Sequence, residues 1–569
     1  MSEMHPAGHL VYFPVARWCS WSTEEMIRDP SKSVMRLSFS SATNSFTKEP
    51  NLKARPLGSP EMDQSRDQDT VMHDDNASMV PPGSQSHQMS ASPQSVVAGL
   101  SPVAMLERQY PTDVLCSRPM LVCMLNDYLE LIYPLIPVVH RPSFRRDLAK
   151  PRDLEDPDFL GLIVAMCATI NAIMPRKFRE YRSAISPLKY QTRTEMINHC
   201  CDIYLGLRSS EYFDEINYQK WAASYLLSIA FFQIGQHNRA RMIEVEAIQL
   251  ARLLEIHQIS SYDGLNCIET QLRKKAFWLM FYGYVHSQLQ NLRRERLTFL
   301  DAPILNNIKL EELMPLEVDD ELIHENVVLP QPASELSLTT GFNIHSRIFW
   351  AALTNIPAKD SPVATEPCDC QRSRNPVLQY KHLEGRVQQL KYMLDDGLPM
   401  QLRQWSTGNI EDPIESPGSE HRRVVRSQFE AMRANIHVTH LWLQSIISDQ
   451  IDTIRPSAGD SQEPGDQRLL WGAREDLCRQ LLHVLHSIEG IHLEPNGHHL
   501  TYKVRDVAVS LLGCPFEAHE VSAKRANEYL LEFTSILSRL DGSEKMNTLS
   551  LQSWVDTDRN SRYAKSRWW

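Results

Sequence analysis

Residues 240–254 read ARMIEVEAIQLARLL, and residues 273–289 read RKKAFWLMFYGYVHSQL. Apolar residues in the first segment recur at spacings of three and four, which places them on one face of a helix. The second segment sets three cations directly against an aromatic pair, and Phe281 and Val285 continue an apolar stripe. Both patterns predict packed helices, and neither brings a catalytic constellation with it.

Helical patterns continue on both sides of this stretch. Ser117 is a predicted helix N-cap, and Pro134 and Pro137 end the helix that follows it. Gly235 is placed to end a helix in the left-handed conformation, so 218–235 and 238–257 form a predicted hairpin. No second copy occurs at a fixed period, which argues against a helical repeat array. The other predicted helices span 158–174, 190–208, 380–394, 423–452, 471–491, 502–512 and 522–540. The fold class predicted is all-α, an irregular multi-helix domain.

Composition limits the partners and the compartment. The 569 residues carry a formal net charge of −11, so the surface as a whole repels nucleic-acid phosphates. The 11 cysteines include no Cys-x-x-Cys pair, which favours reduced cysteines in an intracellular compartment over a disulfide framework. The most apolar segment, 159–174, is shorter than a membrane span, so we expect a core helix and no membrane partner.

The ends and the connections have a different composition. Residues 1–112 are predicted to be a disordered arm rich in Ser, Pro and acidic residues, because they hold too few periodic apolar positions to bury. Within the arm, residues 61–75 mix carboxylates with methionine and valine, which fits either an acidic activation segment or a solvated acidic linker. Loops are predicted at 358–375, 406–420 and 455–467, and a flexible tail at 543–569.

Several motifs occur in a fixed order. Residues 133–144 read YPLIPVVHRPSF, and residues 247–257 read AIQLARLLEIH. Later come Glu269, Arg273-Lys274-Lys275, Phe277-Trp278, Leu313-Met314-Pro315 and Asp319-Asp320-Glu321. These motifs resemble the middle homology region of fungal zinc-cluster transcription factors, the fungal-specific transcription factor domain. Segments 434–444 and 476–482 resemble the same family's later region.

This resemblance implies a domain organisation. It reaches from about 113 to about 540, with an N-terminal part of the regulatory domain at 113–350 and a C-terminal helical part with loop insertions at 351–542. The chain departs from the family at Tyr284-Val285 and at Arg293-Arg294-Glu295-Arg296, where Asp-Arg and Gly-Arg-Pro are usual. We therefore expect a divergent branch.

The family's DNA-binding module holds zinc on six cysteines flanked by basic residues. The first 110 residues contain only Cys19, so no zinc or other cofactor is expected in this chain. A missing upstream exon, evolutionary loss of the module and a misleading resemblance are three open explanations. DNA contact would then require a missing module or a partner protein.

The function implied by the resemblance is regulation of transcription in the nucleus. Protein partners or a homodimer, and possible control by a small-molecule inducer, belong to this expectation. The target could be a secondary-metabolite gene cluster, and the alternative is a helical scaffold or ligand-binding protein that never touches DNA. No enzyme is predicted, because the sequence has no Gly-x-Ser-x-Gly elbow, Walker loop, Gly-x-Gly-x-x-Gly or His-Glu-x-x-His motif.

One set of residues is a candidate regulatory or partner surface: Arg273, Lys274, Lys275, Trp278, Arg293, Arg294, Asp319 and Asp320. The cations could clamp a phosphate or carboxylate. The simpler interpretation is a solvated helix edge that pairs with Asp319, Asp320 or neighbouring acids.

Histidine and cysteine pairs give weaker signals. His437 with His440, and His483 with His486, have a spacing that could hold a metal, but surface or helix-end histidines are favoured. His498-His499 are predicted to lie in an exposed turn. Cys368 and Cys370 supply at most half of a closed zinc site. No metal site is predicted.

Overall fold

A computed structural model of the chain describes residues 111–289, 299–300, 302–353, 375–394, 397–403, 419–454 and 464–540. All of them belong to one compact unit, 106–569. Throughout these residues the elements are helices, without a named strand, and the one β-bridge joins Ile323 to Val328. The predicted all-α class is confirmed. The predicted disordered arm, flexible tail and 358–375 loop lie almost wholly outside the described residues, as do Cys368 and Cys370.

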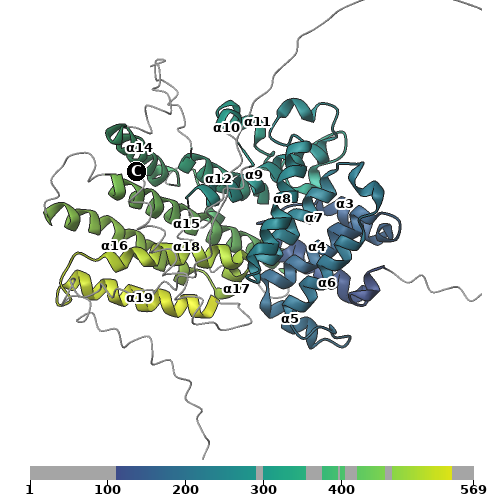
Figure 1. Cartoon of the computed structure of the whole chain (residues 1–569), viewed down its shortest axis with the longest axis horizontal. Coiled ribbons are helices and arrows are strands. Elements are labelled where there is room, and N and C mark those ends of the chain that lie inside the picture. Colours follow the sequence, from purple (N-terminus) through teal and green to yellow (C-terminus); the bar gives the residue numbers. More distant parts are fainter. Residues whose placement is uncertain are drawn as a thin grey trace, which may run out of the picture. The chain divides into compact units, whose positions relative to one another are not determined.

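The first half of the unit is a series of helices, from α2 to α12, of which α4 is the most buried (Figure 1). They are α2 (Arg118–Asp127), a π-helical turn η2 (Tyr128–Ile132), α3 (Arg141–Ala149), α4 (Pro157–Ile173), α5 (Pro175–Arg182), α6 (Arg193–Gly206), α7 (Tyr218–Gln233), α8 (His237–Leu253), α9 (Cys267–Leu289), α10 (Ala302–Asn307), α11 (Leu310–Leu313) and α12 (Leu338–Leu353). Single 3₁₀ turns include η1 (Pro111–Val114), η3 (Arg152–Leu154), η4 (Ser210–Phe213), η5 (Ile259–Tyr262) and η6 (Asp320–Leu322).

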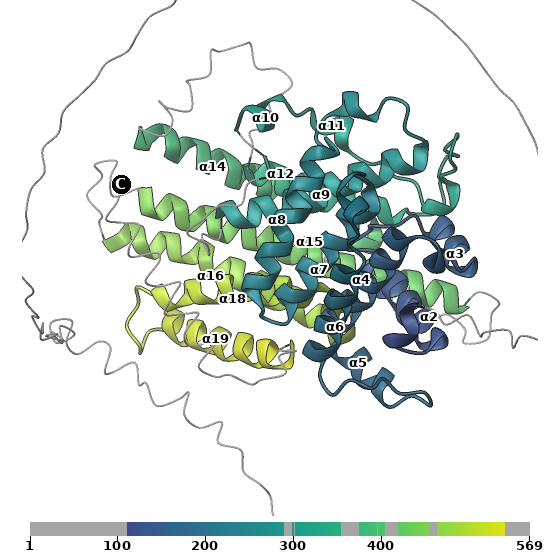
Figure 2. The same cartoon turned by 45° about the vertical axis from the view of Figure 1, so that its right-hand side comes forward.

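The second half is dominated by long helices that lie beside one another in both views (Figures 1 and 2). Its helices are α14 (Pro376–Tyr392), α15 (Ser419–Ile454), α16 (Pro464–Ser487), α17 (Gly490–Leu493), α18 (Gly497–Val509) and α19 (Val521–Leu540), with the 3₁₀ turns η7 (Met400–Leu402), η9 (Glu494–Asn496) and η10 (Ser510–Gly513). Helix α15 packs against α12, α14, α16 and α18, which joins the two halves.

Helix α4 is the buried centre of the first half. Asp156 caps it by accepting hydrogen bonds from the backbone N–H groups of Asp158 (2.9 Å) and Phe159 (3.0 Å), and Pro157 occupies its first position. Every residue from Phe159 to Ile173 is buried, against α2, α6 and α7. Among the described helices, no single one is long and apolar enough to cross a membrane, although α4 and α5 pass that test as a pair bent by 107°.

Helices α7 and α8 form the predicted hairpin. Gly235 lies between them with φ +74°, a conformation that glycine adopts without the Cβ clash of other residues. Asn217 begins α7 by accepting a hydrogen bond from the backbone N–H of Lys220 at 3.0 Å. The two helices pack closely against each other, and both line a cavity together with α9.

Three of the sequence-based expectations are wrong. His437 and His440 are buried core residues of α15, and each hydrogen-bonds a backbone carbonyl, of Leu402 (2.8 Å) and Leu390 (2.5 Å) respectively. His498 and His499 begin α18 and do not form an exposed turn. The predicted 455–467 loop is shorter, because α16 begins at Pro464. A histidine can satisfy its ring nitrogens on carbonyls inside a core, which spacing alone does not reveal.

Candidate functional site

A buried ion pair joins α9 to the turn η6. Lys275 Nζ lies 3.0 Å from Asp320 Oδ1, and the two side chains are only 3% and 2% exposed. Tyr133 donates its hydroxyl hydrogen to Asp320 Oδ2 at 2.5 Å, and the backbone N–H of Arg141 donates to the same oxygen at 2.9 Å. The carboxylate thus receives donors from three separate segments, which is what a buried charge requires.

The His140 side chain also belongs to this cluster, because it hydrogen-bonds the backbone of Asp320 and of Ser143. His140 is the N-cap residue of α3, and its Nδ1 accepts a hydrogen bond from the backbone N–H of Ser143. Because Nδ1 is an acceptor, the ring proton lies on Nε2. Nε2 donates to the backbone carbonyl of Asp320 at 2.7 Å. Although burial alone would raise it, the pKa of Asp320 is held well below its ordinary value by Lys275 and Arg141.

The structure separates the predicted cluster of three cations. Arg273 contacts Glu269 at 2.9 Å and the Leu254 carbonyl, and Lys274 donates to the Met314 carbonyl at 3.3 Å. Only Lys275 reaches an acid of the predicted 319–320 pair. The three cations therefore point to three different partners and do not form a common clamp.

The other members of the set have structural partners as well. Trp278 is fully buried and donates its indole N–H to the Leu313 carbonyl at 3.0 Å. Asp319 accepts hydrogen bonds from Ser337 Oγ (3.2 Å) and Leu338 N (3.3 Å) at the start of α12. Because Lys275, Trp278 and Asp320 are buried, they do not belong to a surface. Arg293 and Arg294 lie outside the described residues, and a partner role for Arg273 and Lys274 stays a prediction.

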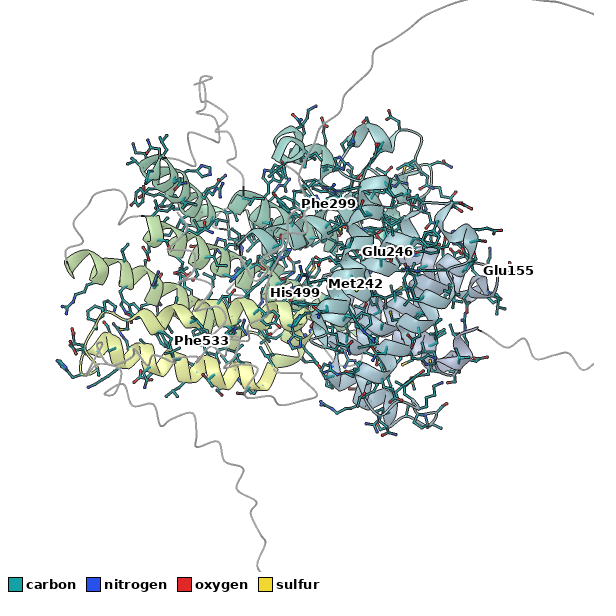
Figure 3. All side chains as sticks on the ribbon, viewed as in Figure 1. Glu155, Met242, Glu246, Phe299, His499 and Phe533 are labelled. Atoms are coloured by element: carbon teal, nitrogen blue, oxygen red, sulfur yellow. The ribbon has the colours of Figure 1, made fainter. Side chains whose placement is uncertain are left out.

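A cavity of about 370 Å³ opens between helices from both halves of the unit. Its wall is built from α7, α8 and α9, from α12 and α15, and from α18, with Leu135, Ile136 and Phe299 closing further parts. Figure 3 labels Phe299 and His499, which lie far apart in sequence and line this same space. The volume is in the range of sites that hold small organic molecules.

Most of the cavity wall is apolar or aromatic. The side chains that give it this character are Ile173, Tyr225, Ile229, Phe232, Leu279, Met280, Tyr282 and Phe349. Gly283 of α9 also lines the cavity, and a Cβ built there would meet no atom within 4 Å. The backbone of α9 is therefore uncovered at this point, with room for a ligand.

Lys503 is the one lysine in this wall. Its side chain is 3% exposed, and Nζ donates to Thr439 Oγ1 at 2.7 Å. Nζ also lies 5.4 Å from the ring centre of Phe349 and 5.6 Å from that of Trp442, which gives partial cation–π compensation. Among the described residues no carboxylate pairs with it, and burial lowers the pKa of Lys503 to about 7.

His286 lies beside this lysine and stacks on Trp442, with ring centres 4.9 Å apart. Its Nδ1 is 2.8 Å from the Tyr282 carbonyl, so Nδ1 carries the proton. The other nitrogen, Nε2, is buried and has no hydrogen-bond partner among the described residues. Burial lowers the pKa of His286 well below its ordinary value, and the Lys503 charge lowers it further.

His345 of α12 completes the basic wall. Its Nε2 is 3.2 Å from Thr439 Oγ1, the same hydroxyl that Lys503 contacts. Burial lowers the pKa of His345 well below its ordinary value, and Lys503 again adds to the effect. We call Lys503, His286, His345 and His499 the basic wall of the cavity.

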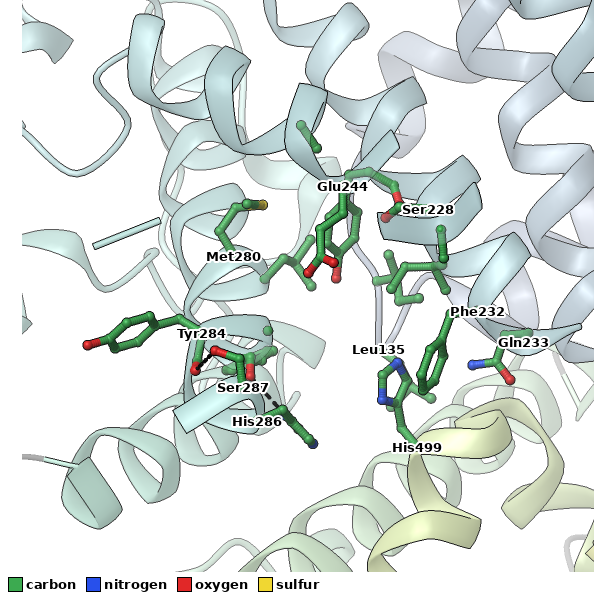
Figure 4. A pocket seen from close by; sticks show the side chains of 18 of the residues that line it. Leu135, Ser228, Phe232, Gln233, Glu244, Met280, Tyr284, His286, Ser287 and His499 are labelled. Atoms are coloured by element: carbon green, nitrogen blue, oxygen red, sulfur yellow. Dashed lines mark hydrogen bonds between the residues drawn. The ribbon is translucent and has the colours of Figure 1, made fainter. Parts of the chain in front are cut away.

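The acidic side chain of the cavity, Glu244 of α8, lies elsewhere. Figure 4 shows Glu244 on one side of the opening and His286 and His499 on the opposite side. Arg241 of the same helix also lines the cavity, so the α8 side carries charges of both signs. In the described part of the chain, no group of three His, Cys, Asp or Glu residues is placed to hold a metal ion.

The cavity and its basic wall were not predicted from the sequence. One signal was present, because Lys503 falls between Leu500, Val504 and Val507 on the apolar stripe of its helix. A lysine on the apolar face of a helix is expected to be buried together with its charge. What the sequence could not show is that α9, α12 and α15 converge on this same point.

Comparison with known proteins gives one match. Residues 125–283, less than half of the chain, match the family model described as "Fungal specific transcription factor domain". This confirms the family resemblance for that stretch, which runs from the end of α2 to the last two turns of α9. No curated protein and no solved structure matches the chain.

Proposed function

We propose that this chain regulates transcription in the nucleus through its helical unit, with the fungal specific transcription factor domain at 125–283 as the premise. That match is the observation that carries the proposal, since the matched family is a domain of transcription regulators and not of enzymes. DNA would be reached through a separate module or a partner protein. A homodimer or protein partners, and control of a secondary-metabolite gene cluster, are part of this proposal.

The cavity is the proposed effector site. It lies between α7, α8 and α9 of the first half and α18 of the second, so an occupant would contact both. A ligand shifts a conformational equilibrium only by its difference in affinity between two states, and a contact that spans two helical groups can supply such a difference. The working model is a helical unit whose activating output depends on cavity occupancy.

A reporter assay tests this function. Residues 106–569 are fused to a heterologous DNA-binding module, and transcription from its cognate promoter is measured in the presence of cell extracts or candidate inducers. We expect reporter transcription to change when the inducer is added. In the Gly283→Phe variant this response should be lost, because the new side chain fills the cavity from a position without close neighbours. Gly385→Phe is the matched control, since a Cβ there also meets nothing within 4 Å and Gly385 does not line the cavity.

The scaffold alternative predicts the opposite outcome. A helical ligand-binding protein without a regulatory role would give a silent fusion, and deletion of its gene would leave transcript levels unchanged. Either result would overturn the proposed function. Transcript profiling of the deletion strain would also identify the regulated genes and decide whether they form a biosynthetic cluster.

A further inference from the structure

We propose that the cavity binds an organic acid, a small molecule with an apolar or aromatic body and one carboxylate that faces the Lys503 wall. The inference rests on the proposal that the cavity is an effector site and names the chemical class of the effector. Two observations carry it: a buried ammonium without an acidic partner among the described residues, and a buried imidazole nitrogen without a hydrogen-bond partner.

The contrast with Lys275 shows what is missing at Lys503. Both lysines are 3% exposed. Lys275 has the Asp320 carboxylate at 3.0 Å, whereas Lys503 has one hydroxyl and two aromatic faces. A buried ammonium without a counter-ion is costly, and an anion supplied from outside would remove that cost. The fold thus builds one half of an ion pair at the edge of an open cavity.

The basic wall can also offer a carboxylate hydrogen-bond donors. Lys503 has N–H groups left after its bond to Thr439, and His286 Nε2 has no partner among the described residues. An anion placed near Lys503 would favour the protonated form of Lys503, whose pKa is about 7, and also that of His286, because opposite charge stabilises both cations. Nε2 would then donate to the same anion, so binding would be accompanied by proton uptake.

The rest of the cavity defines the body of the ligand. Phe232, Tyr225 and Ile229 of α7, with Met280 of α9, offer an apolar surface, and Glu244 lies across the opening from the basic wall. At that end the cavity is lined by both Glu244 and Arg241, three positions apart on α8, so the wall there carries charges of both signs. The basic wall therefore defines the position of one carboxylate, and a polar group such as a hydroxyl at the far end would be tolerated.

Paired probes test the class directly. Benzoate, 2-naphthoate and decanoate are each compared with the corresponding neutral amide by titration calorimetry on the full chain near pH 7.5. We expect at least one acid to bind about tenfold or more tightly than its amide. Its binding should take up protons, as measured in buffers of different ionisation enthalpy, and amide binding should not. If no acid binds more tightly than its amide, the inference is wrong.

Two variants separate charge from packing. Lys503→Met should reduce the acid-to-amide preference to about threefold or less, and Lys503→Arg, which keeps the charge, should retain most of it. An unchanged preference in Lys503→Met would overturn the inference. The wild-type acid-to-amide comparison is decisive even if a variant does not fold. If an acid binds more tightly than its amide but the reporter fusion stays silent, only the proposed function is refuted. If the reporter responds to an inducer but no acid binds more tightly than its amide, only the ligand class is refuted.

Discussion

Tyr133 donates its hydroxyl hydrogen to the carboxylate of Asp320 at 2.5 Å, although the two residues are 187 positions apart. The same carboxylate pairs with Lys275, so the end of η2, the middle of α9 and the turn η6 meet at one buried charge. This cluster lies within and just beyond the stretch that matches the family model. We expect this cluster to hold the helical unit together, and stability measurements can test that expectation.

Replacing Asp320 by asparagine should strongly destabilise the protein. Asp320→Asn leaves the buried Lys275 ammonium without a counter-charge, and removing one partner of a buried pair typically costs about 3–5 kcal/mol. Urea unfolding measures the change. Glu321→Gln is the matched control, because that carboxylate is 50% exposed and its pair with Arg141 should be worth less than about 1 kcal/mol. Equal losses in both variants would contradict a special role for the buried pair.

The Asp320 cluster also predicts a dependence on acid. The pKa of Asp320 is lower in the folded protein than its ordinary value of 3.8, so the folded state binds fewer protons than the unfolded state. Its stabilising effect is complete above pH 4 and is lost as the pH falls below that value toward the folded pKa. Unfolding midpoints measured from pH 5 to pH 2.5 should fall more steeply in wild type than in Asp320→Asn. Parallel curves would contradict this assignment.

Lys503→Met should stabilise the protein at pH 6. The wild-type side chain is buried as a charge without an acidic partner, and an apolar replacement of similar length removes that penalty, worth on the order of 1–3 kcal/mol. Between pH 7 and about 10.5 the unfolded wild type binds the extra proton, so wild-type stability rises with pH and the advantage of the variant fades.

Thermal unfolding at pH 6 and pH 9.5 tests the Lys503 prediction. The groups that face Lys503 are the imidazoles of His286, His345 and His499, and the lowered pKa values of His286 and His345 place their titration outside this window. Lys524→Met, at an exposed lysine of α19, should change stability by less than about 0.5 kcal/mol at either pH. A variant that is less stable than wild type at pH 6 would refute the prediction.

Gly497→Ala should disturb the junction between α7 and α18. Gly497 has φ +57°, and a Cβ there would lie 2.6 Å from the Oε1 atom of the buried Gln233, which accepts the backbone N–H of His498. The backbone at this position, with φ +57° and ψ −152°, is open almost only to glycine, so an alanine costs about 1–3 kcal/mol there, and the clash adds to it. Differential scanning calorimetry should show a lower midpoint. Gly490→Ala, which meets no atom within 4 Å, should stay within about 0.5 kcal/mol of wild type.

Local signals were enough to predict most of the long helices, although α12 (Leu338–Leu353) and the shorter α3 and α5 were not predicted. Gly235 and Pro175 mark helix boundaries because glycine tolerates positive φ and proline lacks a backbone donor, and both occupy such positions. The pairing of the 273–275 cations with Asp319 or Asp320 was correct for Lys275 alone. Burial of His437 and His440 was missed, because it depends on carbonyls of residues 402 and 390 that come close only in the folded chain.

The position of the basic wall late in the chain matters for shortened forms of this protein. Lys503 and His499 belong to α18, well downstream of the last residue that matches the family model. A shortened isoform that stopped before Gly497 would keep the whole family signature and lose the wall that gives the cavity its charge. If the cavity is the effector site, as proposed, such an isoform would match the family model and yet would not respond to the ligand, so the match alone does not identify a ligand-responsive protein.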